Sequence, residues 1–165
     1  MSQRYNNGYY TSDLTSHRAI VFIPYQVSTI FTFEVYRLNI PLFFPDLKLL
    51  TLWWKEYDIM WERSYGDPEQ PRIGELAENL PSWPSPNANT AKSFAFWAKW
   101  SDWHQLPHVQ LFSSLPDLMM QLNAANFTAI SAAMRKQNAQ DRASQIGIWK
   151  GIFDRIQEAK HSIDR

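Results

Sequence analysis

Residues 19–45 constrain the fold of this 165-residue chain most, because two short apolar runs there flank ten residues without Gly or Pro. The first run, residues 19–24, is rich in β-branched and aromatic side chains, which predicts a buried strand. Ser28 is a good N-cap and predicts a helix over residues 29–38. The second run, residues 40–44, predicts another strand. A strand, helix and strand this close together form a βαβ crossover, which requires parallel strands.

Glu34 is the unusual residue of the expected helix, whose other side chains are mostly apolar. Such a helix is expected to be buried, and a buried carboxylate costs free energy unless a partner satisfies it. One interpretation is a local ion pair with Arg37, three residues on, which is the commoner arrangement. The other is a carboxylate that accepts hydrogen bonds from ligand hydroxyls at the carboxyl edge of the sheet.

The same segment resembles the donor-binding segment of the GT-B glycosyltransferases, enzymes with two Rossmann domains that use nucleotide sugars. Many retaining members carry two glutamates separated by seven residues, then a Gly, and a Pro that opens the next strand. Gln26 and Glu34 have this separation, and Pro41 falls seven residues after Glu34. Two positions depart from the pattern. Gln26 replaces a carboxylate, and Asn39 stands where the family usually has Gly, although Asn tolerates a left-handed turn.

The resemblance implies roles for five residues. Glu34 would bind the ribose hydroxyls of the nucleotide, and Gln26, with Tyr25 beside it, would contact the donor sugar. Ser28 and Thr29 would offer backbone N–H groups and hydroxyls to the diphosphate at the helix N-terminus. The matching spacing favours this binding role for Glu34 over the ion pair. The nucleotide sugar is then a substrate, with no cofactor and no metal expected. The identity of the sugar and the choice between retaining and inverting chemistry stay open.

Composition excludes several other classes of function. Sixteen basic and sixteen acidic residues cancel, so no electrostatic footprint for nucleic acid or an anionic membrane is present. The absence of Cys excludes disulfides, thiolate metal sites and a Cys nucleophile. No apolar run reaches the ~18 residues needed to cross a bilayer, and the N-terminus lacks the apolar region of a secretory signal. The compartment remains unknown.

The expected fold class is α/β: a partial Rossmann-like domain with a short parallel sheet, a loop-rich aromatic insert and C-terminal helices. Residues 1–12 are expected to be frayed. Residues 13–165 are expected to form a partial domain similar to the C-terminal domain of GT-B enzymes. Its three parts are the donor motif at residues 13–45, a helical and Pro-rich insert at residues 46–106, and a strand with closing helices at residues 107–160.

Ser12 is expected to cap a short helix or turn over residues 10–17, ahead of the first strand. The insert is expected to begin with a helix over residues 46–61, capped by Asp46. A long loop over residues 64–91 follows, punctuated by Pro and Gly, and its Trp83 could either stack on a ligand or plug the core. A second helix over residues 90–103 carries three tryptophans at helical spacing, which is typical of a core face. These are Trp97, Trp100 and Trp103.

A short strand over residues 109–112 precedes helices that begin at Ser114 and Asn126. A last helix over residues 141–160 repeats apolar residues at three and four, namely Ile146, Trp149, Phe153 and Ile156. His104 and His108 have the spacing of a helical metal site. Because Pro107 interrupts any helix between them and no carboxylate cluster completes a site, metal binding is rejected.

The resemblance implies a nucleotide-sugar-dependent glycosyltransferase that transfers a hexosyl group, represented here by its donor-binding C-terminal portion. The acceptor domain and its unknown acceptor would belong to a part before Met1, and the fragment is expected to be inactive without it, with no catalytic residue assigned. The alternative is a non-catalytic interaction module derived from a truncated glycosyltransferase. A third option is an unrelated flavodoxin-like enzyme, whose ligand would also lie at the strand carboxyl ends.

Overall fold

The computed structural model describes residues 10–26, 29–60, 83–85, 88 and 90–163. Its centre is a sheet of three parallel strands in the order β1-β2-β3: β1 (Ile20–Val21), β2 (Leu42–Pro45) and β3 (Gln110–Phe112). Ile20 pairs with Leu42, and Phe43 pairs with Gln110. The expected α/β class and the short parallel sheet with C-terminal helices are therefore confirmed.

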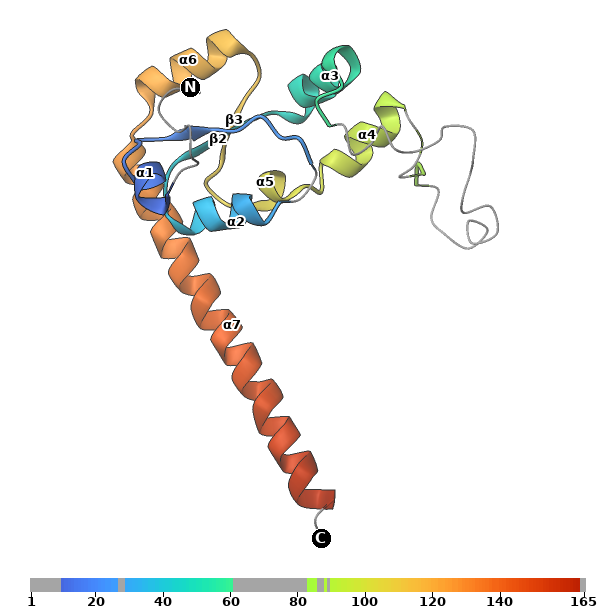
Figure 1. Ribbon diagram of the computed structural model, residues 1–165, viewed down its shortest axis with the longest axis vertical. Helices are drawn as coiled ribbons and strands as arrows, with labels where there is room; N and C mark the ends of the chain where they lie inside the picture. The colour runs from blue at the N-terminus through green and yellow to red at the C-terminus, as the bar shows by residue number, and fades with distance from the viewer. Residues whose placement is uncertain (1–9, 27–28, 61–82, 86–87, 89, 164–165) are drawn as a thin grey trace.

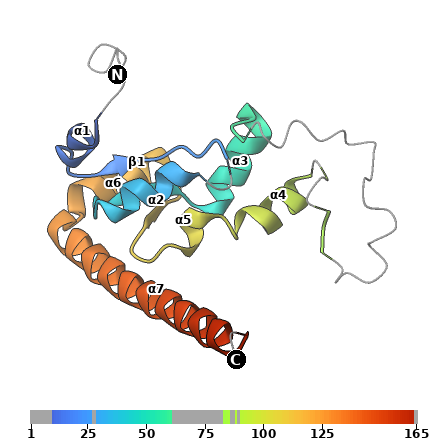
Figure 2. The same cartoon turned by 60° about the horizontal axis from the view of Figure 1, so that its bottom comes forward.

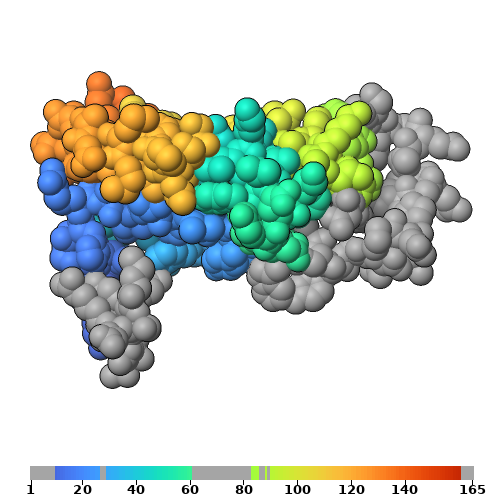
Figure 3. Space-filling view, turned by 90° about the horizontal axis from the view of Figure 1, so that it is seen from above, coloured from blue at the N-terminus to red at the C-terminus, as the bar shows by residue number. Residues whose placement is uncertain are grey.

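Helices flank both faces of this sheet, with α6 above it and α2 and α5 below it in Figure 1. In chain order the helices are α1 (Thr11–Thr15), α2 (Ile30–Arg37), α3 (Leu47–Tyr57), α4 (Ala91–Ala98), α5 (Asp102–Gln105), α6 (Leu115–Ala124) and α7 (Phe127–Ile163). From above, α6, α3 and α4 follow one another along one side of the molecule (Figure 3).

The central strand β2 divides the apolar interior into two parts. Successive residues of a strand point to opposite faces, and all four residues of β2 are buried. Leu42 and Phe44 pack in the larger part with residues from α2, α4, α5 and α7, whereas Phe43 packs in the smaller part with Phe112 and Leu118. Both faces are covered, as parallel sheets require.

Aromatic rings join the insert to the larger part of the core. Phe44 is stacked between Phe22, at 4.9 Å between ring centroids, and Trp103, at 5.5 Å. Trp54 of α3 is stacked on Phe94 of α4 at 4.8 Å. The aromatic residues described in the insert therefore hold α3, α4 and α5 to the sheet.

Two predicted helix starts were wrong by one or two residues. Thr29, not Ser28, caps α2, because its Oγ1 accepts a hydrogen bond from the backbone N of Thr32 at 3.3 Å. Tyr10, not Ser12, precedes α1, and its backbone N donates to Asp13 Oδ2 at 2.7 Å. Residues 11 and 12 thus belong to a helix and not to a frayed end, and residues 1–9 lie outside the described part.

The helix predicted over residues 90–103 is divided into α4 and α5. The first helix ends at Ala98, and Ser101, whose backbone is extended, is the N-cap of the second. The predicted core face of three tryptophans is therefore not formed: Trp103 is 2% exposed, whereas Trp100 is 60% exposed. The preceding helix, α3, begins as predicted at its Asp46 cap but ends at Tyr57, because Asp58 adopts a left-handed conformation with φ of 50°.

The two closing helices predicted after Asn126 are one continuous helix, α7, of 37 residues. Asn126 Oδ1 accepts a hydrogen bond from the backbone N of Ala129 at 3.0 Å, which confirms the predicted cap. Only the first turns pack on the body, where Met134 is fully buried. From residue 139 onward most of the helix is exposed, and it projects away from the sheet (Figures 1 and 2).

Most of the predicted loop over residues 64–91 lies outside the described residues. Trp83 is described there, and its ring lies 5.9 Å from that of Phe96 and 6.0 Å from that of Trp97. It therefore packs on α4 while remaining largely exposed. None of the described helices combines the length and the apolar character needed to span a bilayer.

Candidate donor site

The chain just beyond β1 carries two of the predicted site residues. Phe22 remains paired with the sheet, since its backbone N donates to the Phe43 carbonyl at 2.8 Å. Pro24 is buried, and the chain then turns outward to Tyr25, which is exposed, and Gln26, which is half-buried. Both therefore lie past the carboxyl end of a parallel strand, the region where ligands of open α/β sheets bind.

The start of α2 lies immediately after them. Thr29 Oγ1 lies 2.8 Å from the Oγ1 of Thr32, which is buried, in addition to capping the helix. Both hydroxyls are therefore engaged with their own helix, and a ligand at this end would meet mainly backbone N–H groups and the positive end of the helix dipole. Ser28, which the sequence assigns to the diphosphate, lies outside the described residues.

Glu34 is exposed, so the prediction of a buried carboxylate was wrong. The helix α2 is buried along one face only, at Thr32, Val35 and Tyr36, whereas Ile30 is 79% exposed. Among the described residues no hydrogen bond or ion pair reaches the Glu34 carboxylate, from Arg37 or from any other side chain. The local ion pair therefore has no support, and the carboxylate is open to solvent.

Asp46 and Ser114 occupy the equivalent positions after the other two strands. Asp46 Oδ1 accepts from the backbone N of Leu49 at 2.7 Å, and Ser114 Oγ accepts from the backbone N of Asp117 at 3.2 Å. Three helices, α2, α3 and α6, thus begin at the carboxyl end of the sheet. Their N-termini make this end electrostatically favourable for an anion. The sequence identified both caps but not their shared location.

His104 is a buried polar residue that sequence reasoning did not place in the site. Its Nδ1 lies 2.9 Å from Ser101 Oγ and 2.9 Å from the Ala98 carbonyl, while its Nε2 is buried without a hydrogen-bond partner. Burial lowers its pKa, although the Ala98 carbonyl and the Asp46 carboxylate act in the opposite direction. The imidazole is therefore held neutral close to the end of β2.

The geometry gives His104 and His108 no common metal site. His108 is exposed and has a left-handed backbone with φ of 64°. Within the described ranges no group of three or more His, Asp or Glu side chains could hold a metal ion. The clearest sequence signal for His104 was its position inside an aromatic run, which points equally to simple burial.

Two cavities lie at the opposite, amino-terminal end of the strands. One cleft lies between the end of α2 and α7, and a second lies between the start of β2 and the start of α7. Neither is lined by Tyr25, Gln26, Thr29 or Glu34. Among the described residues no hydrogen bond or ion pair joins Glu34 to Tyr25, Gln26 or Thr29, and both Glu34 and Tyr25 are exposed, so the predicted site is an open surface beside α2.

Comparison with known proteins identified no relative. No family model matches the chain, and no curated protein or solved structure matches it.

Proposed function

We propose that this chain is the donor-binding portion of a nucleotide-sugar-dependent glycosyltransferase of the GT-B type, which transfers a hexosyl group together with an acceptor domain. One observation carries the proposal. The helix of a parallel βαβ crossover follows the carboxyl end of β1, and that helix bears an exposed carboxylate, Glu34, which has no hydrogen-bond or ion-pair partner among the described residues. An exposed carboxylate keeps both oxygens free to accept hydrogen bonds from sugar hydroxyls.

The spacing along α2 suits a nucleoside diphosphate. Glu34 follows Thr29 by five residues, which corresponds to about 7.5 Å along the helix axis. A ribose held at Glu34 would therefore place its diphosphate near the N-terminus of α2, where Thr29 and the neighbouring Ser28 would meet it. The consecutive strand order and the helices on both faces support a Rossmann-like arrangement, which is part of the same proposal.

Gln26 and Tyr25 would contact the donor sugar in this arrangement. The Gln26 amide both donates and accepts hydrogen bonds, so it can bind sugar hydroxyls. Because it carries no charge, it cannot stabilise developing positive charge as a carboxylate would. We therefore assign Gln26 to binding and not to catalysis, and we expect transfer to require groups from the acceptor domain.

The proposal is tested by calorimetric titration of the full chain with UDP and with GDP. Binding of one of them should weaken at least about tenfold in Glu34→Ala, the loss typical of a charge-assisted hydrogen bond. Glu56→Ala, which removes another exposed helical carboxylate, is the matched control and should bind like the unmodified chain. Equal affinities of the unmodified chain and Glu34→Ala would remove the assignment.

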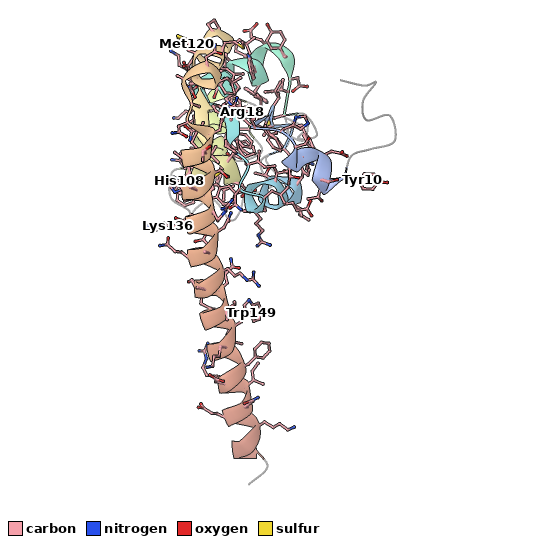
Figure 4. All side chains as sticks on the ribbon, turned by 90° about the vertical axis from the view of Figure 1, so that its left-hand side faces the viewer. Tyr10, Arg18, His108, Met120, Lys136 and Trp149 are labelled. Carbon is pink, nitrogen blue, oxygen red and sulfur yellow. The ribbon has the colours of Figure 1, made fainter. Side chains whose placement is uncertain are left out.

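The exposed half of α7 favours a second candidate, a non-catalytic interaction module. Ile146, Trp149, Phe153 and Ile156 are each 57% to 58% exposed. They recur at spacings of three, four and three, as the core positions of a coiled coil do. Figure 4 shows Trp149 on the part of α7 that extends beyond the body.

The partner proposed for this surface is the same helix of a second copy of the chain. A coiled-coil seam is complementary to a helix with the same pattern, and here both copies carry it. Burying the four side chains and the adjoining stems on two copies removes on the order of 1,000 Å², which is the area that a specific interface needs. A long helix without a packed face is also marginal in water, so pairing would stabilise it.

Sedimentation velocity separates this candidate from the first. The unmodified chain should form a dimer that the double substitution Trp149→Ser and Phe153→Ser converts to a monomer. Gly147 and Gly151 lie on the opposite side of the helix, where added methyl groups would meet open space. Replacing both with Ala is the control and should leave the dimer intact. A monomer at all concentrations for the unmodified chain would exclude the second candidate.

A further inference from the structure

The larger of the two clefts has a volume of about 570 Å³ and lies at the amino-terminal end of the strands, opposite the end that carries Tyr25, Gln26 and Thr29. One wall is the C-terminal end of α2, the other is the middle of α7, and the segment before β3 contributes Leu106. The volume falls within the range of small-molecule sites. The lining includes Tyr36, Arg37, Asn39, Arg135, Asp141 and Arg142.

Positive charge dominates this cleft. Arg37, Arg135 and Arg142 line it, and Asp141 is the only carboxylate among the described residues of the lining. Asp141 Oδ1 already accepts a hydrogen bond from Gln137 Nε2 at 2.8 Å. Within the described part of the chain, no hydrogen bond or ion pair involves the side chains of the three arginines. The chain as a whole is neutral, so the excess is a local feature.

The walls of the cleft are fixed by hydrogen bonds. Asn138 Nδ2 of α7 donates to the Tyr36 carbonyl at 3.1 Å and to Asn39 Oδ1 at 2.8 Å, which joins α7 to the end of α2. The Tyr36 hydroxyl donates to the Pro107 carbonyl at 3.0 Å, which joins α2 to the segment before β3. Burial and the Asp141 carboxylate raise the pKa of Tyr36, so its hydroxyl stays protonated as this donor.

A second cavity of about 390 Å³ shares Asn39 and Arg135 with the first and extends the basic surface. It adds Arg18, whose guanidinium lies 4.9 Å from the centroid of the Phe127 ring (Arg18 is labelled in Figure 4). The stacked ring restricts Arg18 without neutralising its charge. Arg135 therefore stands between two basic hollows.

We propose that the larger cleft binds a small organic phosphate that carries at least two negative charges. Guanidinium groups recognise phosphate oxygens through paired N–H donors, and three arginines that line one cleft without an ion-pair partner among the described residues favour an anion there. Gln145 in the lining supplies a further hydrogen-bonding group for the organic part, whereas the Asn39 amide is already bonded to Asn138 and to the Arg37 carbonyl. Glu34 does not line this cleft, but its neighbours Phe33 and Arg37 on α2 do, so variants on α7 are the ones that test the cleft separately from the proposed donor site.

Calorimetric titration of the full chain with inorganic pyrophosphate tests this site. Arg135→Gln and Arg142→Gln should each weaken binding at least about tenfold, since each removes a charge-assisted contact. Arg155→Gln is the matched control, because Arg155 is exposed on the same helix but outside the cleft, and its affinity should stay within about twofold.

Two results would overturn the proposal. One is a folded unmodified chain that shows no saturable binding of pyrophosphate. The other is an equal loss of affinity in Arg155→Gln, because that would show attraction to the net charge of α7 and not to the cleft. Circular dichroism of each variant confirms that α7 is intact, so that a loss of binding reports on the side chain removed.

Discussion

The two ends of the parallel sheet differ in both shape and charge. At the carboxyl end, α2, α3 and α6 begin with their own capping side chains, and the chain after β1 presents the exposed Tyr25 and the half-buried Gln26. At the amino-terminal end, the end of α2 and α7 enclose a cleft whose lining holds three arginines and one carboxylate. Topology predicts a ligand at the first end, whereas shape and charge favour one at the second. We therefore expect the first end to bind a nucleotide sugar through its diphosphate at the N-terminus of α2, and the second to bind a small organic phosphate through arginines.

The largest effect should come from the core that both ends share. Trp103→Ala removes a buried ring stacked on Phe44 and should lower the free energy of unfolding by about 3–5 kcal/mol. Trp100→Ala, three residues earlier but 60% exposed, should change it by less than about 0.5 kcal/mol. Urea denaturation followed by circular dichroism measures both. Similar values for the two variants would contradict the division of this segment into buried and exposed tryptophans.

Asn39→Ala should lower both the free energy of unfolding and the affinity for pyrophosphate at the amino-terminal end of the sheet. Asn39 has φ of 60°, and its Oδ1 accepts the hydrogen bond from Asn138 that joins α2 to α7. A left-handed conformation costs an ordinary residue about 1–2 kcal/mol, so the free energy of unfolding should fall by that amount. Urea denaturation measures this change in the free energy of unfolding. The control is Asn123→Ala, at an exposed position of α6. The same variant should weaken pyrophosphate binding but leave nucleotide binding unchanged; a loss at both ends would mean that the ends are not independent.

A smaller effect is expected at the carboxyl end from Asp46→Ala. The Asp46 carboxylate caps α3, and replacing such a cap with Ala costs about 1 kcal/mol. Asp154→Ala, on the exposed part of α7, lacks a capping role and serves as the control. Both are measured by urea denaturation. If Asp46→Ala lowered the free energy of unfolding no more than the control, the Asp46 cap would not stabilise α3.

The smallest expected effect is a pH dependence. Burial lowers the pKa of His104 from its ordinary 6.5, so the unfolded chain binds a proton here more readily than the folded chain does. The free energy of unfolding should therefore fall as the pH drops from 6.5 through the lowered pKa. His104→Gln should reduce this slope, whereas His108→Asn, at an exposed position, should not. Denaturation midpoints at several pH values compare the slopes, and identical slopes for the unmodified chain and His104→Gln would contradict the burial of this imidazole.

Local features of the sequence predicted much of the sheet and of the helix starts. The apolar runs in residues 19–45 predicted β1, α2 and β2, and Asp46 and Ser114 cap helices as their side chains predict. Such features depend on neighbouring residues in the chain, so they can be recognised without knowledge of the tertiary structure. The prediction of a buried strand over residues 19–24 was wrong, because β1 is an edge strand of only Ile20–Val21 and Val21 is 42% exposed. Glu34 was misplaced because the apolar pattern of α2 does not reveal that one face of this helix remains uncovered.

Features that depend on distant contacts could not be predicted. Arg37 and Arg135 are almost one hundred residues apart in the chain, and only the packing of α2 on α7 brings them to one cleft. The stacking of Trp103 on Phe44 after the break between α4 and α5 likewise joins segments far apart in the chain. The second half of α7 was predicted as a separate closing helix because its apolar residues recur as in a packed helix. In the structure this half continues the first half without a break and is exposed.

The proposed contact between Glu34 and the ribose is tested most directly by a pair of ligands. Calorimetry would compare the nucleoside diphosphate that binds with its 2′,3′-dideoxy analogue, in the unmodified chain and in Glu34→Ala. If Glu34 binds the ribose, loss of the hydroxyls should weaken binding at least about tenfold in the unmodified chain and have little effect in Glu34→Ala. An equal loss of affinity in both proteins, or none in either, would contradict a ribose contact at Glu34 and with it the proposed donor site.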